Sequence, residues 1–197
     1  MVRLILTSCI IVATLLNSGC SNDSGRAPPA SSQMIGKVQL YTFSPDHRNL
    51  LHDAQPFILP PSTSVRDALD SLGRHLTKSY FSKTYTDKAT DIHFDVVRID
   101  EISTQSRPFR IAVINMVDTE KDAMGYFFQG STGARTTFCM LAATFTQSHL
   151  APPLLDGLVL LYNGEMLSEL DHINLAGILT PRLVRHVAYR AIRGIKR

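Results

Sequence analysis

The cysteine with the most specific sequence context is Cys20, which follows an apolar run at residues 4–16 and two small residues. One positive charge precedes the run, and the run is shorter than a membrane-spanning helix, a pattern typical of a secretion signal. A cysteine at its end is typical of a bacterial lipoprotein, in which Cys20 would receive lipid, such as palmitate, and become the new N-terminus. Asn17 stands where an aliphatic residue is usual, so an uncleaved anchor or an ordinary signal is the alternative. Both interpretations place the rest of the chain on the extracytoplasmic side of a bacterial cell envelope.

The chain after this signal, residues 1–20, divides into a polar segment and one domain. Residues 21–35 contain Ser, Asn, Asp, Gly and Pro without apolar periodicity, which predicts a flexible tether. Residues 36–181 are enough for one compact domain, and the chain's 44% hydrophobic content is ordinary for a globular protein. No second apolar run approaches the length of a membrane span.

The side chains that could support catalysis or metal binding are isolated in the sequence. Cys9 leaves with the signal and Cys20 is the lipid site, so Cys139 has no partner for an intramolecular disulfide. Cys139 falls within an apolar helical pattern, where a thiolate is poorly solvated and unreactive. His149 and His172 show no helical spacing typical of zinc ligands. We therefore expect no catalytic residue, no metal and no cofactor, and we do not expect an enzyme.

The C-terminal segment, residues 182–197, has the clearest charge pattern of the chain. Its cations, without an acidic residue among them, are Arg182, Arg185, Arg190, Arg193, Lys196 and Arg197. Its apolar residues follow helical spacing and are Leu183, Val184, Val187, Ala188, Ala191 and Ile195. This pattern predicts a basic amphipathic helix that binds an anionic membrane surface or an acidic partner. A helix packed on the domain with a solvated basic face explains the pattern equally well, whereas export makes a nucleic-acid partner a poor candidate.

Two helices in the domain are indicated by capping residues and by apolar spacing. The first follows Ser62 or Ser64, with Asp67 in the capping-box position relative to Ser64. The second follows Ser131 or Thr132 and ends before the Pro152–Pro153 pair. The expected core positions of the second helix are Ala134, Phe138, Leu141, Ala142 and Phe145.

The strands are predicted from alternating or continuous apolar residues. We expect them at residues 37–43, 55–59, 92–102, 109–117 and 158–162, with a further strand conceivable at 172–178. Asn163-Gly164 is the dipeptide best suited to a two-residue hairpin turn. The order β-β-α-β-β-α-β predicts an α+β fold with two helices on one face of a mainly antiparallel sheet.

The face of the second helix opposite its core positions predicts a contact surface. It carries no charge between Arg135 and His149, although an exposed helix normally carries charges on its solvent side. The neutral residues on this face are Thr136, Met140, Ala143, Thr144 and Gln147. Because charge depletion is characteristic of interface cores, we interpret this face as a docking site for an envelope partner or for a second copy. Cover by the C-terminal helix of the same chain is the alternative.

The segment from Tyr126 to Leu175 resembles the GerMN domain of sporulation and germination proteins. The resemblance lies in the helix that ends at residues 143–147, ATFTQ, and in the strand and turn from Val159 to Gly164. It covers residues 36–181. It implies a non-enzymatic envelope module with a fold related to the ring-building motifs of secretion assemblies.

These observations together predict a lipid-anchored extracytoplasmic interaction module, in a sporulation, germination or envelope assembly. One alternative is a membrane-surface protein that acts through its basic C-terminal helix. The other is an envelope hydrolase with an unrecognised site, which would be distinguished by polar residues that converge in a pocket with perturbed pKa values.

Overall fold

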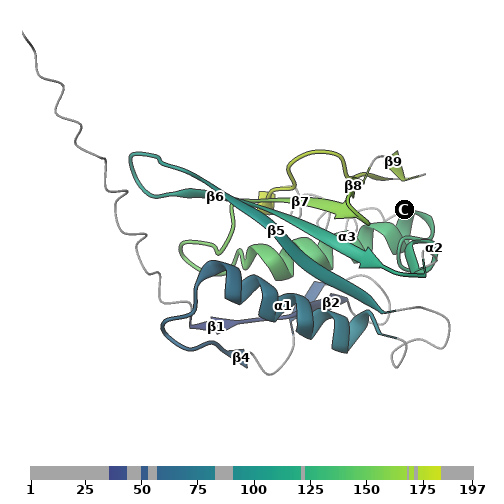
Figure 1. The fold of residues 1–197 in the computed structure, drawn as a ribbon, viewed down its shortest axis with the longest axis horizontal. Helices are drawn as coiled ribbons and strands as arrows, with labels where there is room; N and C mark the ends of the chain where they lie inside the picture. Colours follow the sequence, from purple (N-terminus) through teal and green to yellow (C-terminus); the bar gives the residue numbers. More distant parts are fainter. Residues whose placement is uncertain are drawn as a thin grey trace, which may run out of the picture. The chain divides into compact units, whose positions relative to one another are not determined.

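The computed structural model describes residues 36–43, 50–52, 57–82, 91–120, 123–167, 169–170 and 173–182. All of them belong to one compact unit, Gln33–Arg197, which is distinct from Met1–Ser32. Its helices and largely antiparallel strands confirm the expected α+β class (Figure 1). The predicted signal and tether, and residues 183–197 of the predicted basic helix, lie outside the described residues.

The main sheet has four strands in the order β5-β6-β7-β8. They are β5 (Ile92–Ile102), β6 (Phe109–Asp118), β7 (Gly157–Tyr162) and β8 (Glu165–Met166). The β5–β6 hairpin is antiparallel, as expected, with a register shift between Val96 and Arg98. β7 instead pairs with β6 in parallel, from Ile111 opposite Gly157 to Met116 opposite Tyr162. A parallel neighbour requires a long crossover, and here the crossover contains two helices.

The turn between β7 and β8 is the one that Asn163-Gly164 predicts. Asn163 and Gly164 have φ angles of 50° and 87°, the left-handed values that a primed two-residue turn requires. The turn is also held from β6, because Asn115 Oδ1 accepts from the Gly164 amide at 2.8 Å. Asn163 Oδ1 accepts from the amide of Asp118 at 2.9 Å. The hairpin prediction is confirmed.

Helix α1 (Val65–Tyr80) begins at the predicted cap and covers the edge of the sheet at β5. The Ser64 hydroxyl accepts from the Asp67 amide at 3.1 Å, which caps the helix, and donates to the Asp67 carboxylate at 2.6 Å. Further along, Arg66 donates to the carbonyl of Val96 at 2.6 Å and Thr77 to that of Ile92 at 2.7 Å. These side chains occupy carbonyl groups that an edge strand would otherwise expose.

Helix α3 (Gly130–Thr146) forms as expected but begins differently. Gln129 is its N-cap and makes no side-chain capping bond, so the predicted cap at Ser131 or Thr132 is wrong. A short helix that the sequence did not predict, α2 (Ala123–Phe127), precedes it, and the Thr137 hydroxyl donates to the Phe127 carbonyl at 2.5 Å. The structure therefore starts α3 by packing against α2 rather than by a polar cap.

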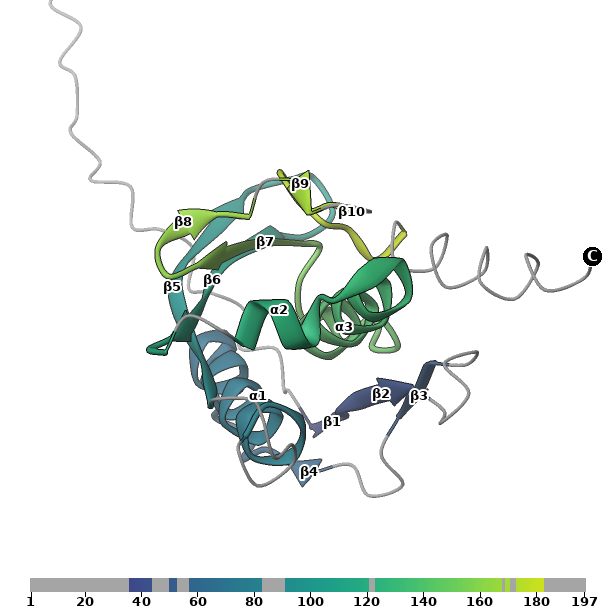
Figure 2. The same cartoon turned by 90° about the vertical axis from the view of Figure 1, so that its right-hand side faces the viewer.

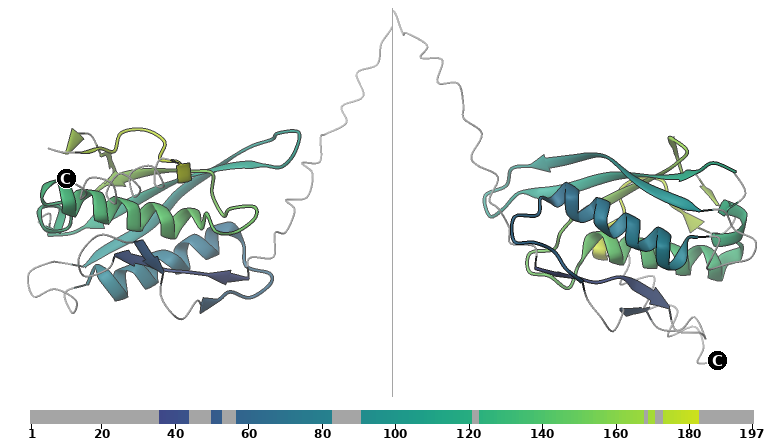
Figure 3. Two further views of the ribbon diagram at one scale, coloured as in Figure 1. Left: turned by 180° about the vertical axis from the view of Figure 1, so that it is seen from behind. Right: turned by 60° about the horizontal axis from the view of Figure 1, so that its bottom comes forward.

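The helices lie on one face of the main sheet, and the small N-terminal strands lie beyond them (Figure 2). These strands pair as β1 (Lys37–Val38) with β4 (Phe57–Ile58) and β2 (Tyr41–Phe43) with β3 (Leu50–His52). β3 was not predicted, and the expected strand at 37–43 is divided into β1 and β2. Figure 3 shows β2 beside α3 from behind.

Aromatic rings join the helices to the inner face of the sheet. Phe94 of β5 contacts Phe145 of α3 and Phe81 after α1, with ring centroids 5.6 and 5.2 Å apart. Phe81 also contacts Phe127 of α2 at 4.6 Å. The described chain ends with β9 (Glu169–Leu170), β10 (Ile173–Asn174) and a bridge between Leu179 and Leu158 on β7. The described part contains no helix long and apolar enough to cross a membrane.

Candidate functional site

The predicted docking face of α3 is buried by the chain itself. Met140 and Ala143 are 8% and 4% exposed, and Thr144 and Gln147 are fully buried. Residues 39–41 cover this end of the helix. The expectation that these side chains, together with half-buried Thr136, form a free docking surface is therefore wrong.

The cover is held by hydrogen bonds from side chains at the end of α3 to the backbone of residues 39–41. The Gln147 side chain accepts from the Gln39 amide at 2.9 Å and donates to the Gln39 carbonyl at 2.7 Å. The Thr144 hydroxyl accepts from the amide of Tyr41 at 3.0 Å. The helix face lacks charges because its neutral polar groups bind backbone, which explains the pattern that suggested an interface.

Cys139 is buried within α3, as predicted for a structural cysteine. Burial raises the pKa of its thiol to about 12, although the nearby positive charge of Arg135 opposes the shift. The thiolate is therefore scarce at neutral pH and the residue is a poor nucleophile. In the described part of the chain, no three His, Cys, Asp or Glu residues are grouped to hold a metal ion.

Two predicted sites fall largely outside the described residues. Cys20 is outside them, as are Arg185, Arg190, Arg193, Lys196 and Arg197. Arg182, the last described residue, is exposed. The lipid site and the membrane-binding surface stay predictions.

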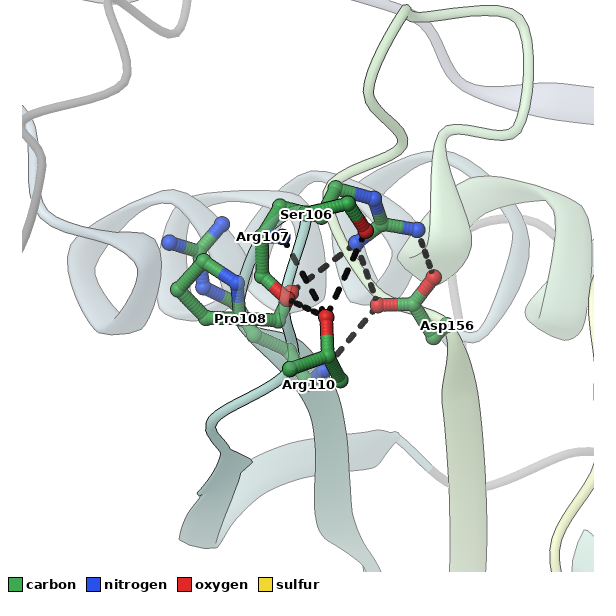
Figure 4. Close-up of polar contacts among 6 residues, drawn as sticks. Ser106, Arg107, Pro108, Arg110 and Asp156 are labelled. Atoms are coloured by element: carbon green, nitrogen blue, oxygen red, sulfur yellow. Dashed lines mark hydrogen bonds and ion pairs between the residues drawn. The ribbon is translucent and has the colours of Figure 1, made fainter.

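The described residues contain a charged cluster at the turn of the β5–β6 hairpin, beside the start of β7 (Figure 4). The Arg107 guanidinium donates to both carboxylate oxygens of Asp156, with Nη1 2.8 Å from Oδ2. The Arg110 amide also donates to Oδ2, at 3.0 Å, and the Asp156 amide donates to the Arg110 carbonyl at 2.8 Å. Asp156 thus joins the hairpin turn to the loop before β7.

The electrostatics of this cluster keep Asp156 ionised. Burial by itself would raise its pKa, but hydrogen bonds from Arg107 and the Arg110 amide, with both positive charges, lower the pKa below its ordinary value. The hydrogen bond to Asp156 correspondingly raises the pKa of Arg107. The Arg110 side chain, 5% exposed, donates instead to the Glu101 carboxylate at 2.8 Å. Asp156 therefore stabilises the hairpin turn and does not exchange a proton readily at neutral pH.

A hollow of about 640 Å³ adjoins this cluster. Its mainly apolar lining comes from the loop after α3, the root of β6 and the last described residues: Phe109, Leu150, Ala151, Pro152, Pro153 and Pro181. Asp156 and Arg182 supply the charges at its wall. Loops at the end of a sheet and a partly apolar lining are typical of binding sites. This hollow is the candidate functional site.

A second hollow, of about 630 Å³, lies between α1 and β5 and differs in chemistry. Charges of both signs line it, among them Asp70, Arg74, Lys78 and Asp95. They come from the solvent-facing sides of two regular elements. We regard this hollow as a solvated surface.

Comparisons with known proteins give one distant likeness. No protein-family model and no curated protein matches the sequence. One solved structure, described as "2.5 Angstrom Crystal Structure of Putative Lipoprotein from Clostridium perfringens", is similar to the chain with a TM-score of 0.37 and 18% identity. The similarity covers 76% of this chain and 91% of that one. A likeness at this distance assigns neither a family nor a function, so the GerMN resemblance stays a prediction.

The Arg107–Asp156 cluster and the adjoining hollow were not predicted from the sequence. Arg107 and Asp156 are far apart along the chain, and they meet because β7 enters the sheet parallel to β6 beside Arg110. The sequence signals were present but separate: a turn before Phe109, and Asp156 immediately before an apolar strand. Only the parallel pairing joins them.

Proposed function

We propose that this chain is a lipid-anchored extracytoplasmic protein whose domain acts through protein contacts in the cell envelope. The observation that carries the proposal is the position of Cys20 after the apolar run at residues 4–16. The described domain begins at Gly36. Residues 21–35, as an extended tether, would let the domain stand up to about 50 Å from its anchor.

A binding role fits the described side chains better than hydrolysis does. Asp156 has both oxygens engaged and a lowered pKa, which makes it a weak general base. Cys139 has a pKa raised to about 12 and lies within a helix. Neither group has the perturbation that a nucleophile or an acid–base catalyst requires.

The apolar hollow is the part of the described surface that we propose for the contact. Phe109, Leu150 and Pro153 are only half-buried, so a partner's aromatic or aliphatic side chain could cover them. Insertion of one such side chain into a pocket is a common anchor of protein interfaces. The Arg107–Asp156 ion pair would keep the wall of the hollow in place before a partner arrives.

The anchor is tested by fractionation and intact mass of the full chain expressed in a bacterial envelope. The Cys20→Ser variant should lose the lipid mass and accumulate as precursor or as soluble protein. Cys9→Ser, a cysteine replacement in the same signal, should leave the lipid mass and the membrane fraction unchanged. Wild-type chain without lipid, or with an unchanged membrane fraction after Cys20→Ser, would contradict the anchor.

The contact is tested separately by cross-linking the wild-type chain and two variants in envelopes. Leu150→Asp places a charge in the hollow and should abolish a specific cross-linked species. Ile58→Asp places the same charge at an exposed residue of β4, and the cross-linked species should persist in this variant. Equal cross-linking by both variants would exclude the hollow while leaving the anchor intact.

The finer assignment to a sporulation or germination assembly rests on the GerMN resemblance. A second candidate function is contact with an anionic membrane surface. It is favoured because residues 182–197 contain six cations and no acidic residue. Such contact is compatible with a lipid anchor, because two weak membrane attachments reinforce one another.

A further inference from the structure

The main sheet has an apolar strip on the face that the helices do not cover. Ala112, Ile114 and Met116 of β6 are fully buried in the core, so strand alternation directs Ile111 and Val113 to the opposite face. The strip continues across the paired strands and consists of Ile111, Val113, Val117, Val159, Leu161 and Met166. We call these six residues the outer strip.

The outer strip is more apolar than a solvent-facing sheet surface should be. A sheet with one wet face normally alternates apolar and polar residues, whereas the outer positions of β6 and β7 are apolar except for Asn115, whose side chain accepts from the Gly164 amide. Val113 is already only 7% exposed and Met166 is 56% exposed. The strip is therefore only partly buried.

The end of the described chain reaches one end of this strip. Ile178, 52% exposed, lies over Gly157, where an added Cβ would be 2.6 Å from its Cγ2 and 3.4 Å from Ile111. Leu179 then bridges to Leu158 on β7. Pro181 and Arg182 follow with helical backbone beside Phe109, the first residue of β6.

The size of the strip fits one helix rather than a second copy of the chain. From Ile111 to Val117 the strand rises about 20 Å, and β6 to β8 spans about 10 Å. This footprint is well below the roughly 800 Å² that each partner contributes to a stable interface. Residues 183–197 as a helix would be about 22 Å long and about 10 Å wide.

The alternative place for a C-terminal helix is already occupied. Residues 39–41 cover the neutral face of α3. Thr180 and Pro181 have the residue types favoured at the N-cap and first position of a helix. Asp95 and Asp100 of β5 border the outer strip, opposite Asn115 and Ile111 in register, and Arg98, opposite Val113, lies between them with an ion pair to Asp100. Asp95 is therefore the carboxylate that a basic helix would meet there.

We propose that residues 183–197 form a helix whose apolar residues pack on the outer strip, as an intramolecular cover of the sheet. The apolar set, Leu183, Val184, Val187, Ala188, Ala191 and Ile195, then faces β6 and β7. The six cations face solvent together and form one basic surface on the side of the domain opposite its helices.

Hydrogen exchange of the mature chain, made soluble by Cys20→Ser, tests the cover without depending on the anchor. Amides of residues 183–197 should exchange at least about tenfold more slowly than those of the same segment as a free peptide, because a lone helix of this length is marginal in water. Leu161→Asp in the outer strip and Ala188→Asp in the tail should each remove the protection. Arg193→Ala, on the opposite side of the same predicted helix, should retain it.

Protection of α3 in every variant shows that the domain is folded, and Ala188→Asp provides the test if Leu161→Asp unfolds it. A tail without protection in the wild-type chain would overturn the proposal. So would protection that survives both aspartates, or protection that is lost on dilution, since the latter would indicate a second copy. The result is independent of lipid on Cys20 and of the partner hollow.

Discussion

Gln147 and Gln39 exchange two hydrogen bonds through a single side chain, 2.9 and 2.7 Å long. Gln147 follows the last residue of α3 in the left-handed conformation, with φ 46°. That conformation ends the helix. The Gln147 side chain then bonds the backbone amide and carbonyl of Gln39, as a neighbouring strand would. A helix end and the N-terminal segment are thereby fixed by one residue.

Gln147→Leu should destabilise the domain by about 2–4 kcal/mol, because it leaves the backbone amide and carbonyl of Gln39 without these partners. Urea unfolding measures the change. Gln39→Ala is the matched control, since it retains the backbone groups that make both bonds, and it should cost much less. Equal losses for the two variants would show that the bonds contribute little.

Asp156→Asn should destabilise the domain by about 2 kcal/mol at pH 7, because it removes the charge that accepts from Arg107 and the Arg110 amide. The pKa of Asp156 is lower in the folded chain, so its contribution is complete above the unfolded value of about 3.9. The contribution is lost as the pH falls through the lower folded value. The difference between wild type and Asp156→Asn should therefore shrink in acid.

Unfolding of both proteins between pH 7 and pH 2 measures this convergence. Asp100→Asn is the control, because the Arg98–Asp100 pair is exposed and such pairs contribute little. A difference between wild type and Asp156→Asn that stays constant with pH would contradict the assigned role of the carboxylate.

Gly73→Ala should destabilise the domain by about 1–3 kcal/mol, although alanine is the better helix former. An added Cβ would lie 3.0 Å from the Cβ of Phe94 and 3.1 Å from its carbonyl oxygen. Gly133→Ala in α3 has its closest contact at 3.9 Å, so it should be neutral or stabilise by up to about 1 kcal/mol. Thermal unfolding of the two variants should shift the midpoint in opposite directions, and a stabilising Gly73→Ala would refute close packing of α1 on β5.

Binding of the mature Cys20→Ser chain to anionic liposomes should fall steeply with salt if residues 182–197 contact the membrane. Each cation near the surface contributes about 1 kcal/mol, so Arg190→Ala with Arg193→Ala should weaken binding by about 2 kcal/mol. Lys37→Ala with Arg74→Ala removes the same charge from the domain and should have less effect. Equal binding to neutral and anionic liposomes, or none to either, would exclude the membrane candidate.

The elements that local residues specify were predicted well. Ser64 and Asp67 lie within one helical turn of each other, and Asn163 and Gly164 are adjacent, so their hydrogen bonds and φ angles follow from the local sequence. β3 and α2 were not predicted, because short elements are stabilised by what they pack against.

The candidate hollow could not be predicted, since its walls come from three separate segments. Phe109, Leu150 and Pro181 meet because the crossover through α2 and α3 returns β7 parallel to β6. No residue of the chain indicates that direction, which depends on how the apolar faces of α3 and the sheet are buried together.

By itself, the sequence determined the cap of α1 and the β7–β8 turn, the approximate lengths of β5 and β6, and a helix face without charge between Arg135 and His149. It could not decide what covers that face, because a neutral surface suits a partner, a C-terminal helix or a neighbouring strand alike. In the tertiary structure residues 39–41 cover that face, since the side chains of Gln147 and Thr144 satisfy backbone groups of this segment. Buried backbone groups require partners, and that requirement can be assigned only when the chain is folded.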